Sequence, residues 1–246
     1  DGALAYLPFE VLTKEVAVSF RDAPYLIRTC EVNYAPSLQI YSLSQNTQAS
    51  RTDEIVAYSF TKSLGELYAL PGTKKEVALL DKIFSGSDIL LRTNEDVTRQ
   101  RLIDDLVTEG DIIHLGLHAS SSLADKLENK IDCYSPTGLD QDALYGYEIA
   151  PLSIKAHTVV LTACQSAFGP VVEGEGTYSL ARAFKQAGVS NVVASLWNLS
   201  DGTTSTLVGS FYNALSQGKS ASTSLSLAKR NYLKEADELM THPHFW

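Results

Sequence analysis

The stretch "VVLTACQSAFG", residues Val159–Gly169, runs from apolar residues suited to a buried strand into a loop of small and polar residues. Cys164 stands at the point where the strand pattern ends. A short apolar run of this kind is typical of a strand that is covered on both faces, as in a parallel sheet. The cysteine is then either a small buried side chain or a nucleophile presented at the edge of that sheet.

The segments on either side alternate between strand and helix patterns, which indicates a parallel sheet covered by helices on both faces. We therefore expect an α/β fold, a three-layer α/β/α sandwich with a mostly parallel central sheet. The predicted strands lie at 54–60, 88–92, 111–120, 157–164 and 191–197, and the predicted helices at 73–84, 94–110, 143–149, 176–189, 203–216 and 220–239.

Local signals set some of these boundaries. Asn94 is the expected N-cap of its helix, and Gly110 and Gly188 are expected to end helices. The residues before Asp53 alternate with mixed polarity, which predicts an antiparallel edge extension of the sheet. The stretch from Ser120 to Asp142 is hydrophilic and is expected to form a loop.

Two of the predicted strands end in residues that can carry chemistry. The strand "DIIHLGLH" ends at His118, and the next core strand ends at Cys164. If the two strands are parallel neighbours, both side chains emerge at the carboxyl edge of the sheet, where ligands bind in open α/β folds. A thiolate attacks carbonyl carbon, and an imidazole accepts and returns the proton, so a Cys/His dyad needs no metal and no cofactor.

For several of these residues a purely structural role is the alternative to a functional one. Most free cysteines are small buried side chains, and Cys30 and Cys133 fit that description because neither ends a strand of the parallel series. His114 lies on the same strand face as His118 and is expected to be a structural histidine with its hydrogen bonds satisfied. The two histidines span roughly 13 Å in a strand, too far apart to bind one zinc ion.

The glycine-rich and helix-opening motifs also have two readings. The "GEG" sequence at 174–176 resembles a phosphate-binding turn, but Glu173 and Glu175 repel phosphate and no Walker lysine follows. A loop beside the cysteine fits it better. Ser200 or Asp201 can serve as a helix N-cap, and the alternative is that Asp201 lines a pocket and pairs with a cationic substrate group.

The composition excludes some classes of binding partner and cellular setting. The 246 residues carry a net charge of −9 with a pI of about 5.0, which disfavours nucleic-acid binding. The apolar runs are too short to span a membrane. Three cysteines without a CxxC pair fit neither a disulfide framework nor a cysteine zinc site, so we expect a reducing, cytoplasmic setting.

Taken together, these motifs resemble the CHAT domain, a caspase-like module related to caspases and separase and often found behind tetratricopeptide repeats. The resemblance covers nearly the whole chain. It is carried by "DGALAYLPFEVL" (1–12), "LPGTKKEV" (70–77), "IIHLGLHAS" (112–120), "VVLTACQSAFG" (159–169), "GEGTYSLARAFKQAGVSNVVASLWNLSD" (174–201) and the terminal "HPHFW" (242–246).

The resemblance implies a caspase-hemoglobinase fold and a cysteine endopeptidase. His118 matches the family's catalytic histidine and Cys164 its nucleophile, and the amides of Ala119 and Cys164 match the donors to the oxyanion. The family usually has glycine at position 119, and alanine is strained there if a positive φ is required. The expected substrate-binding residues are Ser195, Trp197 and Asn198, which pair with the substrate backbone, and Asp201, Glu173 and Glu175, which favour a basic residue before the scissile bond.

The resemblance further predicts one CHAT-like peptidase domain over 1–246, truncated at both ends, with a protein substrate and either upstream tetratricopeptide repeats or a regulatory subunit as partner. Related modules act in bacterial signalling and defence. Two other readings stay open. One is a weakly active or inactive caspase-like interaction module, motivated by Ala119, and the other is a nucleotide-binding α/β domain that rests only on "GEG" and the predicted sheet.

Overall fold

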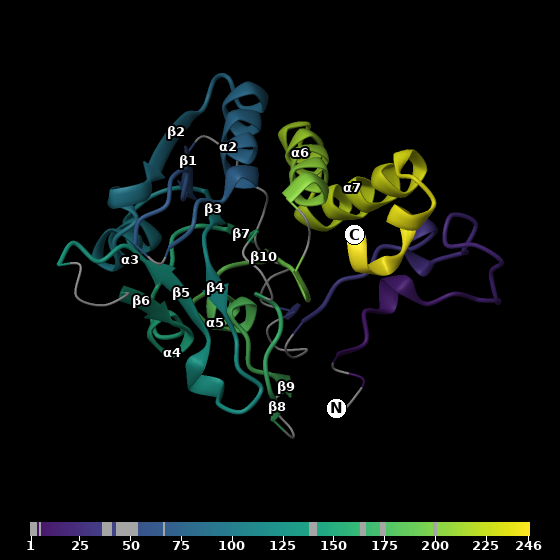
Figure 1. Cartoon of the computed structure of the whole chain (residues 1–246), viewed down its shortest axis with the longest axis horizontal. Helices are drawn as coiled ribbons and strands as arrows, with labels where there is room; N and C mark the ends of the chain where they lie inside the picture. Colours follow the sequence, from purple (N-terminus) through teal and green to yellow (C-terminus); the bar gives the residue numbers. More distant parts are fainter. Residues whose placement is uncertain are drawn as a thin grey trace.

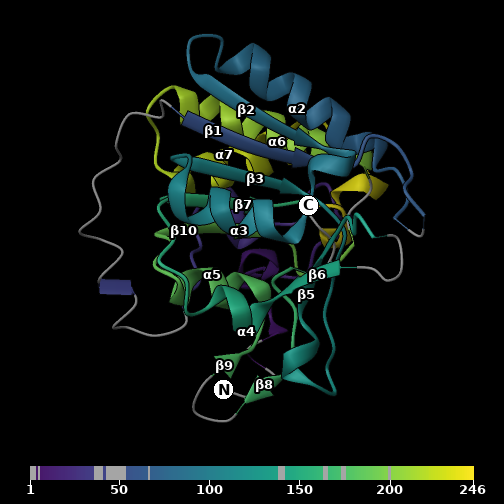
Figure 2. The ribbon, with the colours of Figure 1, turned by 90° about the vertical axis from the view of Figure 1, so that its left-hand side faces the viewer.

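The structure is a computed structural model that describes residues 4, 6–35, 41–42, 54–65, 67–137, 142–162, 166–172, 176–198 and 201–246, apart from the side chain of Asp201. Five parallel strands form the central sheet in the order β10–β7–β3–β1–β2. Figure 2 shows the strands following one another in this order. They are β1 (Glu54–Ser59), β2 (Asp88–Thr93), β3 (Ile112–Gly116), β7 (Thr158–Leu161) and β10 (Asn191–Ala194).

Alternation along the strands divides the core into two layers. In β1, Ile55 and Ala57 face one layer, while Val56 and Tyr58 face the other. The first layer packs on α2 (Pro71–Ile83), α6 (Asp201–Ser216) and α7 (Ala221–Glu235), and the second on α3 (Arg99–Thr108), α4 (Gly146–Ile149) and α5 (Leu180–Gln186). Figures 1 and 2 show α6 and α7 on one side of the sheet and α3 on the other. The predicted three-layer α/β/α sandwich is confirmed.

The stretch expected to be a hydrophilic loop contains strands instead. A small antiparallel sheet has the order β4–β5–β6, formed by β4 (Ala119–Ser120), β5 (Lys130–Cys133) and β6 (Asp142–Tyr145). Ile131, Cys133 and Leu144 of this sheet are buried against the α3 layer, which is why a mostly polar sequence is ordered there. Residues 142–145 therefore belong to a strand, and the helix expected at 143–149 begins only at Gly146. A second pair, β8 (Val171–Val172) and β9 (Gly176–Thr177), is also antiparallel.

Several helix boundaries differ from the predictions, and at the starts of α3 and α5 the reason is that another residue supplies the cap. Thr98, not Asn94, caps α3, and its side chain accepts a hydrogen bond from the Arg101 amide. Asn94 has a φ of 56° and uses its side-chain oxygen to accept the amides of Thr61 and Lys62. Helix α5 begins after its cap Ser179, and α7 ends at Glu235 instead of Leu239.

The N-terminal strap, residues 6–35, does not extend the sheet as predicted. Its described part forms short 3₁₀ turns and one isolated antiparallel bridge, Thr13↔Tyr25. It packs on α7 and the C-terminal residues instead: the Arg230 side chain donates to the Ile27 carbonyl at 2.6 Å, and the rings of Tyr25 and Trp246 lie 5.1 Å apart. Figure 1 shows the strap, in purple, beside α7 and the C-terminal residues, in yellow.

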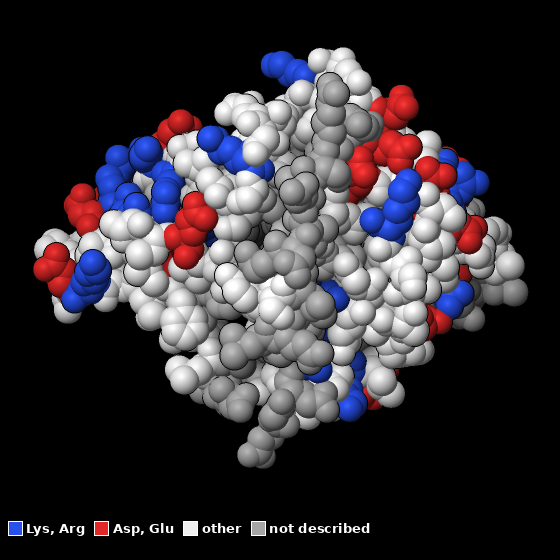
Figure 3. Space-filling model, turned by 180° about the vertical axis from the view of Figure 1, so that it is seen from behind, with Lys and Arg blue, Asp and Glu red and all other residues white. Residues whose placement is uncertain are grey.

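The surface charge is mixed on the face that Figure 3 presents. Acidic and basic side chains both occur on each side of this face, and its middle is largely uncharged or not described. In the part of the chain that the structure describes, no helix combines the length and apolar character needed to cross a membrane.

Candidate active site

His118 lies two residues beyond the end of β3, and its ring is held from two sides. Nε2 lies 2.7 Å from the main-chain carbonyl oxygen of Tyr68. The ring stacks on the buried ring of Phe60, with 6.0 Å between centroids and 28° between planes. Because a carbonyl oxygen only accepts hydrogen bonds, Nε2 carries the hydrogen, and Nδ1 of the neutral ring keeps its lone pair free to accept a proton.

The backbone around His118 is fixed by the small antiparallel sheet. The Asp132 amide donates to the His118 carbonyl at 2.9 Å, and the next pair in the register is Ala119↔Ile131. Hydrogen-bonded and non-hydrogen-bonded pairs alternate in antiparallel sheets, so the Ala119 amide points away from β5. Asn94 is the only residue other than glycine with a positive φ among those the structure describes, so Ala119 carries no such strain.

Strand β7 lies directly beside β3 and runs parallel to it, as the sequence predicted. Cys164 follows β7 but lies outside the described residues. The loop leaves the strand at Thr162, whose amide donates to the Leu115 carbonyl at 3.2 Å and whose hydroxyl donates to Glu76 Oε2 at 2.9 Å.

The chain returns to the sheet at Ser166, which is fully buried. Its hydroxyl lies 3.4 Å from the Leu161 carbonyl and accepts the Ser195 amide at 3.2 Å, and its carbonyl accepts the Ala181 amide at 3.1 Å. Thr162 and Ser166, on either side of Cys164 in the sequence, are thus hydrogen-bonded at the carboxyl edge of the sheet. His118 follows β3 at the same edge.

The loop that follows Ser166 is tied to the N-terminal strap through Tyr6. The Tyr6 hydroxyl donates to the Gly169 carbonyl and accepts the Val171 amide, both at 3.1 Å, and its ring packs on Phe168 with 5.5 Å between centroids. Gly169 itself has no room for a side chain, because a Cβ there would lie 1.7 Å from the Tyr178 carbonyl oxygen. The small residues of the motif therefore serve packing as well as chemistry.

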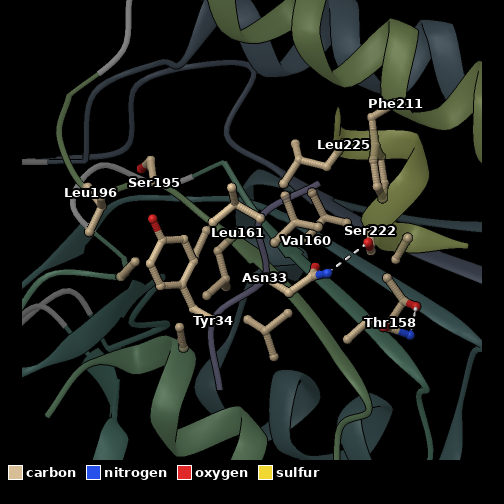
Figure 4. Close-up of a pocket in the computed structure, with 18 of the residues that line it drawn as sticks. Asn33, Tyr34, Thr158, Val160, Leu161, Ser195, Leu196, Phe211, Ser222 and Leu225 are labelled. Carbon is tan, nitrogen blue, oxygen red and sulfur yellow. Dashed lines mark hydrogen bonds between the residues drawn. The ribbon is translucent and has the colours of Figure 1, made fainter. Parts of the chain in front are cut away.

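A cavity of about 860 Å³ lies along β7 and β10, between the strap and the α6–α7 layer. Figure 4 shows Tyr34 of the strap in this cavity, near Leu196 and Ser195. The expected substrate-binding residues Ser195 and Trp197 line it. The Ser195 amide donates to the Ser166 hydroxyl at 3.2 Å, and the Ser195 carbonyl accepts the Ala167 amide at 2.9 Å.

The acidic residues expected to bind a basic side chain cannot be placed. Glu173 and Glu175 lie outside the described residues, as does the side chain of Asp201, the first residue of α6. Glu10 is the one carboxylate in the described lining of the cavity, and Lys229 binds it at 2.7 Å. Burial opposes ionisation of Glu10, but the Lys229 charge and the hydrogen bonds from Lys229 and Tyr34 outweigh it and lower the pKa of Glu10.

His114 and Cys133 behave as expected for structural residues, and Cys30, which was expected to be a small buried side chain, does not. His114 is fully buried, with Nε2 3.1 Å from Glu76 Oε2 and Nδ1 3.0 Å from the Tyr212 hydroxyl. Cys133 is buried, and burial, together with Asp142 and Asp132 nearby, raises the pKa of its thiol to about 12. Cys30 is exposed. Among the described residues, no cluster of three His, Cys, Asp or Glu side chains could hold a metal ion.

Four contributors to this site escaped sequence reasoning. Tyr68 acts through its carbonyl, which leaves no trace in the residue type. Phe60 and Tyr6 read as ordinary apolar positions. Glu76 could have been predicted from the sequence, because a glutamate on the buried side of an amphipathic helix needs a hydrogen-bond or charge partner.

Comparison with solved structures places this fold among cysteine peptidases. A complex of Porphyromonas gingivalis RgpB pro- and mature domains has a TM-score of 0.52 at 10% identity, covering 80% of this chain and 48% of that one. The Arg specific cysteine proteinase gingipain R has a TM-score of 0.51 at 10% identity, covering 82% and 47%. The Saccharomyces cerevisiae separase–securin complex has a TM-score of 0.52 at 15% identity, covering 79% and 12%.

These identities establish the fold alone, and the chain spans about half the length of the gingipain chains and an eighth of the separase chain. The comparison with curated protein sequences gives no match. The family model named CHAT domain matches residues 1–246, the full length. The chain therefore belongs to the CHAT domain family and has the caspase-like fold that its motifs predicted.

Proposed function

We propose that the protein is a cysteine endopeptidase in which Cys164 is the nucleophile and His118 the general base. The observation that carries the proposal is the 2.7 Å contact between His118 Nε2 and the Tyr68 carbonyl, which leaves Nδ1 free to accept a proton. Cys164 is joined to Thr162 and to Ser166 by two residues of chain each, and two residues span about 7 Å at most. The proposal therefore places the thiol at the edge of the sheet at which His118 stands.

The reaction follows from these positions. His118 Nδ1 takes the thiol proton, and the thiolate attacks the scissile carbonyl carbon, forming a carbon–sulfur bond and an oxyanion. The amides of Ala119 and Cys164 stabilise that oxyanion, and the outward direction of the Ala119 amide supports this role. Collapse breaks the peptide bond as imidazolium protonates the leaving amine, and water then hydrolyses the thioester with His118 as base.

The substrate is proposed to be an extended segment of a protein partner. Strand β10 lies at the edge of the central sheet, so an extended peptide can pair along its outer side as an added strand. We propose a basic residue before the scissile bond, contacted by Asp201, Glu173 and Glu175. The Arg specificity of one structural neighbour, gingipain R, supports this choice, as does the net charge of −9.

Cleavage of matched peptides tests the proposal. Three peptides that differ only in Arg, Lys or Asp before the scissile bond are incubated with the wild type and with Cys164→Ala. We expect cleavage of the Arg and Lys peptides by the wild type alone. Cleavage of the Asp peptide contradicts the specificity, and absence of thiol-dependent cleavage of all three leaves the alternative of an inactive interaction module.

A further inference from the structure

Glu76 is a buried carboxylate that the proposed reaction does not use. It lies on α2, and its side chain is 2% exposed. One oxygen, Oε2, contacts both His114 Nε2 at 3.1 Å and the Thr162 hydroxyl at 2.9 Å. An ionised carboxylate costs several kcal/mol to bury unless it is bonded to suitable donors, so this site is built around two specific contacts.

The histidine of this cluster is held from its other side by α6. Tyr212 is fully buried, and burial and the nearby Glu76 charge raise the pKa of its hydroxyl well above the ordinary value, so the hydroxyl stays protonated. It can donate to His114 Nδ1, which leaves the hydrogen on Nε2 to be donated to Glu76. Glu76 is thereby fixed from three elements: its own helix, β3 and the end of β7.

The same stretch of chain also holds the histidine half of the candidate dyad. Tyr68, three residues before α2, accepts the hydrogen bond from His118. Thr73 in the first turn packs against β3 so closely that a Cβ on Gly116 would lie 2.8 Å from it. Residues 68–76 therefore contact both β3, which leads to His118, and the end of β7, which leads to Cys164.

We propose that Glu76 is a positioning residue that acts through Thr162. Its carboxylate holds the hydroxyl at the last described position before Cys164 and so sets the direction in which the nucleophile loop leaves β7. Because α2 and the segment before it also orient His118, a single rigid element aligns both halves of the dyad. The inference rests on the proposed peptidase activity and assigns a role to residues outside its chemistry.

The inference can be tested by replacing Thr162 with residues that keep the shape of its side chain or its hydroxyl. Thr162→Val removes the hydrogen bond to Glu76, whereas Thr162→Ser retains it. Misplacing a reacting group by about 1 Å can cost 10²-fold in rate, so we expect kcat on the Arg peptide to fall by roughly 10- to 100-fold in Thr162→Val. We expect KM to stay within about twofold and Thr162→Ser to recover most of kcat.

Two further variants separate positioning from general stability. Thr241→Val removes another buried hydroxyl, one that donates to the Glu238 carbonyl in the segment after α7 and not to Glu76, and should leave kcat unchanged. Glu76→Gln should lower kcat by itself but add little to Thr162→Val, because two groups that act through one bond are not additive. Full additivity of the two losses, or a wild-type kcat in Thr162→Val, overturns the inference.

Amide hydrogen exchange of the peptide covering 161–168 gives a readout that needs no activity. We expect faster exchange in Thr162→Val than in the wild type and no change in Thr241→Val. If the wild type cleaves no peptide, the proposed function fails on its own account, and exchange decides this inference. Faster exchange in Thr162→Val then supports the hold of Glu76 on the loop, and unchanged exchange overturns it.

Discussion

His118 Nε2 donates a hydrogen bond to the main-chain carbonyl of Tyr68 at 2.7 Å. In many hydrolases a carboxylate orients the catalytic histidine, whereas the histidine proposed for that role here is bonded to a backbone atom. A carbonyl cannot be removed by substitution of its side chain, and it fixes the tautomer without adding negative charge to the site. In the neutral ring Nδ1 therefore carries the lone pair, and it is the atom that the proposed function uses as the base.

Replacing His118 tests that base directly. His118→Gln removes the proton acceptor, and general-base catalysis contributes about 10²- to 10⁴-fold, so kcat should fall by that factor. The side chain is only partly buried, so the melting temperature should change little. Steady-state cleavage of the Arg peptide measures the effect. A variant that keeps kcat within threefold of the wild type contradicts the role of His118.

Tyr6 is predicted to hold the loop that follows the nucleophile. Tyr6→Phe keeps the packing on Phe168 but removes the hydroxyl that bonds Gly169 and Val171. A hydrogen bond contributes about 1 kcal/mol, so we expect a loss of stability of that order and faster amide exchange over 168–172. Tyr147→Phe, at an exposed tyrosine, is the matched control. Equal amide exchange over 168–172 in both variants would contradict the prediction that Tyr6 holds this loop to the strap.

The buried thiol of Cys133 should make stability fall at alkaline pH. Burial raises its pKa from 9.0 to about 12 in the folded protein. Between these values the unfolded chain releases a proton that the folded protein retains, so the free energy of unfolding decreases as pH rises, by roughly 1.4 kcal/mol per pH unit. Chemical denaturation of the wild type and of Cys133→Ala between pH 9 and 11 measures the difference in slope. Equal slopes show that Cys133 ionises as readily in the folded state.

Substitution of Val160 should lower the stability of the fold, whereas substitution of Cys164 should not. Val160 is 1% exposed in the core beneath α6 and α7. Val160→Ala should cost about 1–3 kcal/mol, because it removes buried methyl groups and leaves a cavity. Cys164→Ser should leave the melting temperature nearly unchanged. A large loss of stability in Cys164→Ser identifies the cysteine as a structural thiol.

The sequence predicted what depends on buried patterns and strand order. The apolar runs around His114 and Val160 indicated parallel core strands, and the structure confirms that β3 and β7 are neighbours. The small sheet of β4, β5 and β6 was missed because its buried residues, such as Ile131 and Leu144, are too few to stand out among polar ones. This small sheet forms because its buried residues pack against the α3 layer, and no local sequence pattern indicates that packing.

The site could be predicted only as far as its side chains. His118 could be proposed from the sequence because it follows a buried strand, and its role stays a prediction. The Tyr68 carbonyl could not be proposed, since every residue has a carbonyl. Asn94 was assigned to a helix cap on its type alone, although Thr98 also suits that role. The link from Glu76 to Thr162 joins segments 86 residues apart and appears only once the sheet is assembled.

The most direct test of the central claim is a peptide that carries Arg next to a thiol-reactive electrophile, followed by mass analysis of the labelled protein. We predict one adduct on Cys164 that forms rapidly in the wild type, slowly in His118→Gln and not in Cys164→Ala. Labelling of Cys164→Ala at the wild-type rate, or equal rates in the wild type and His118→Gln, contradicts a nucleophile activated by His118.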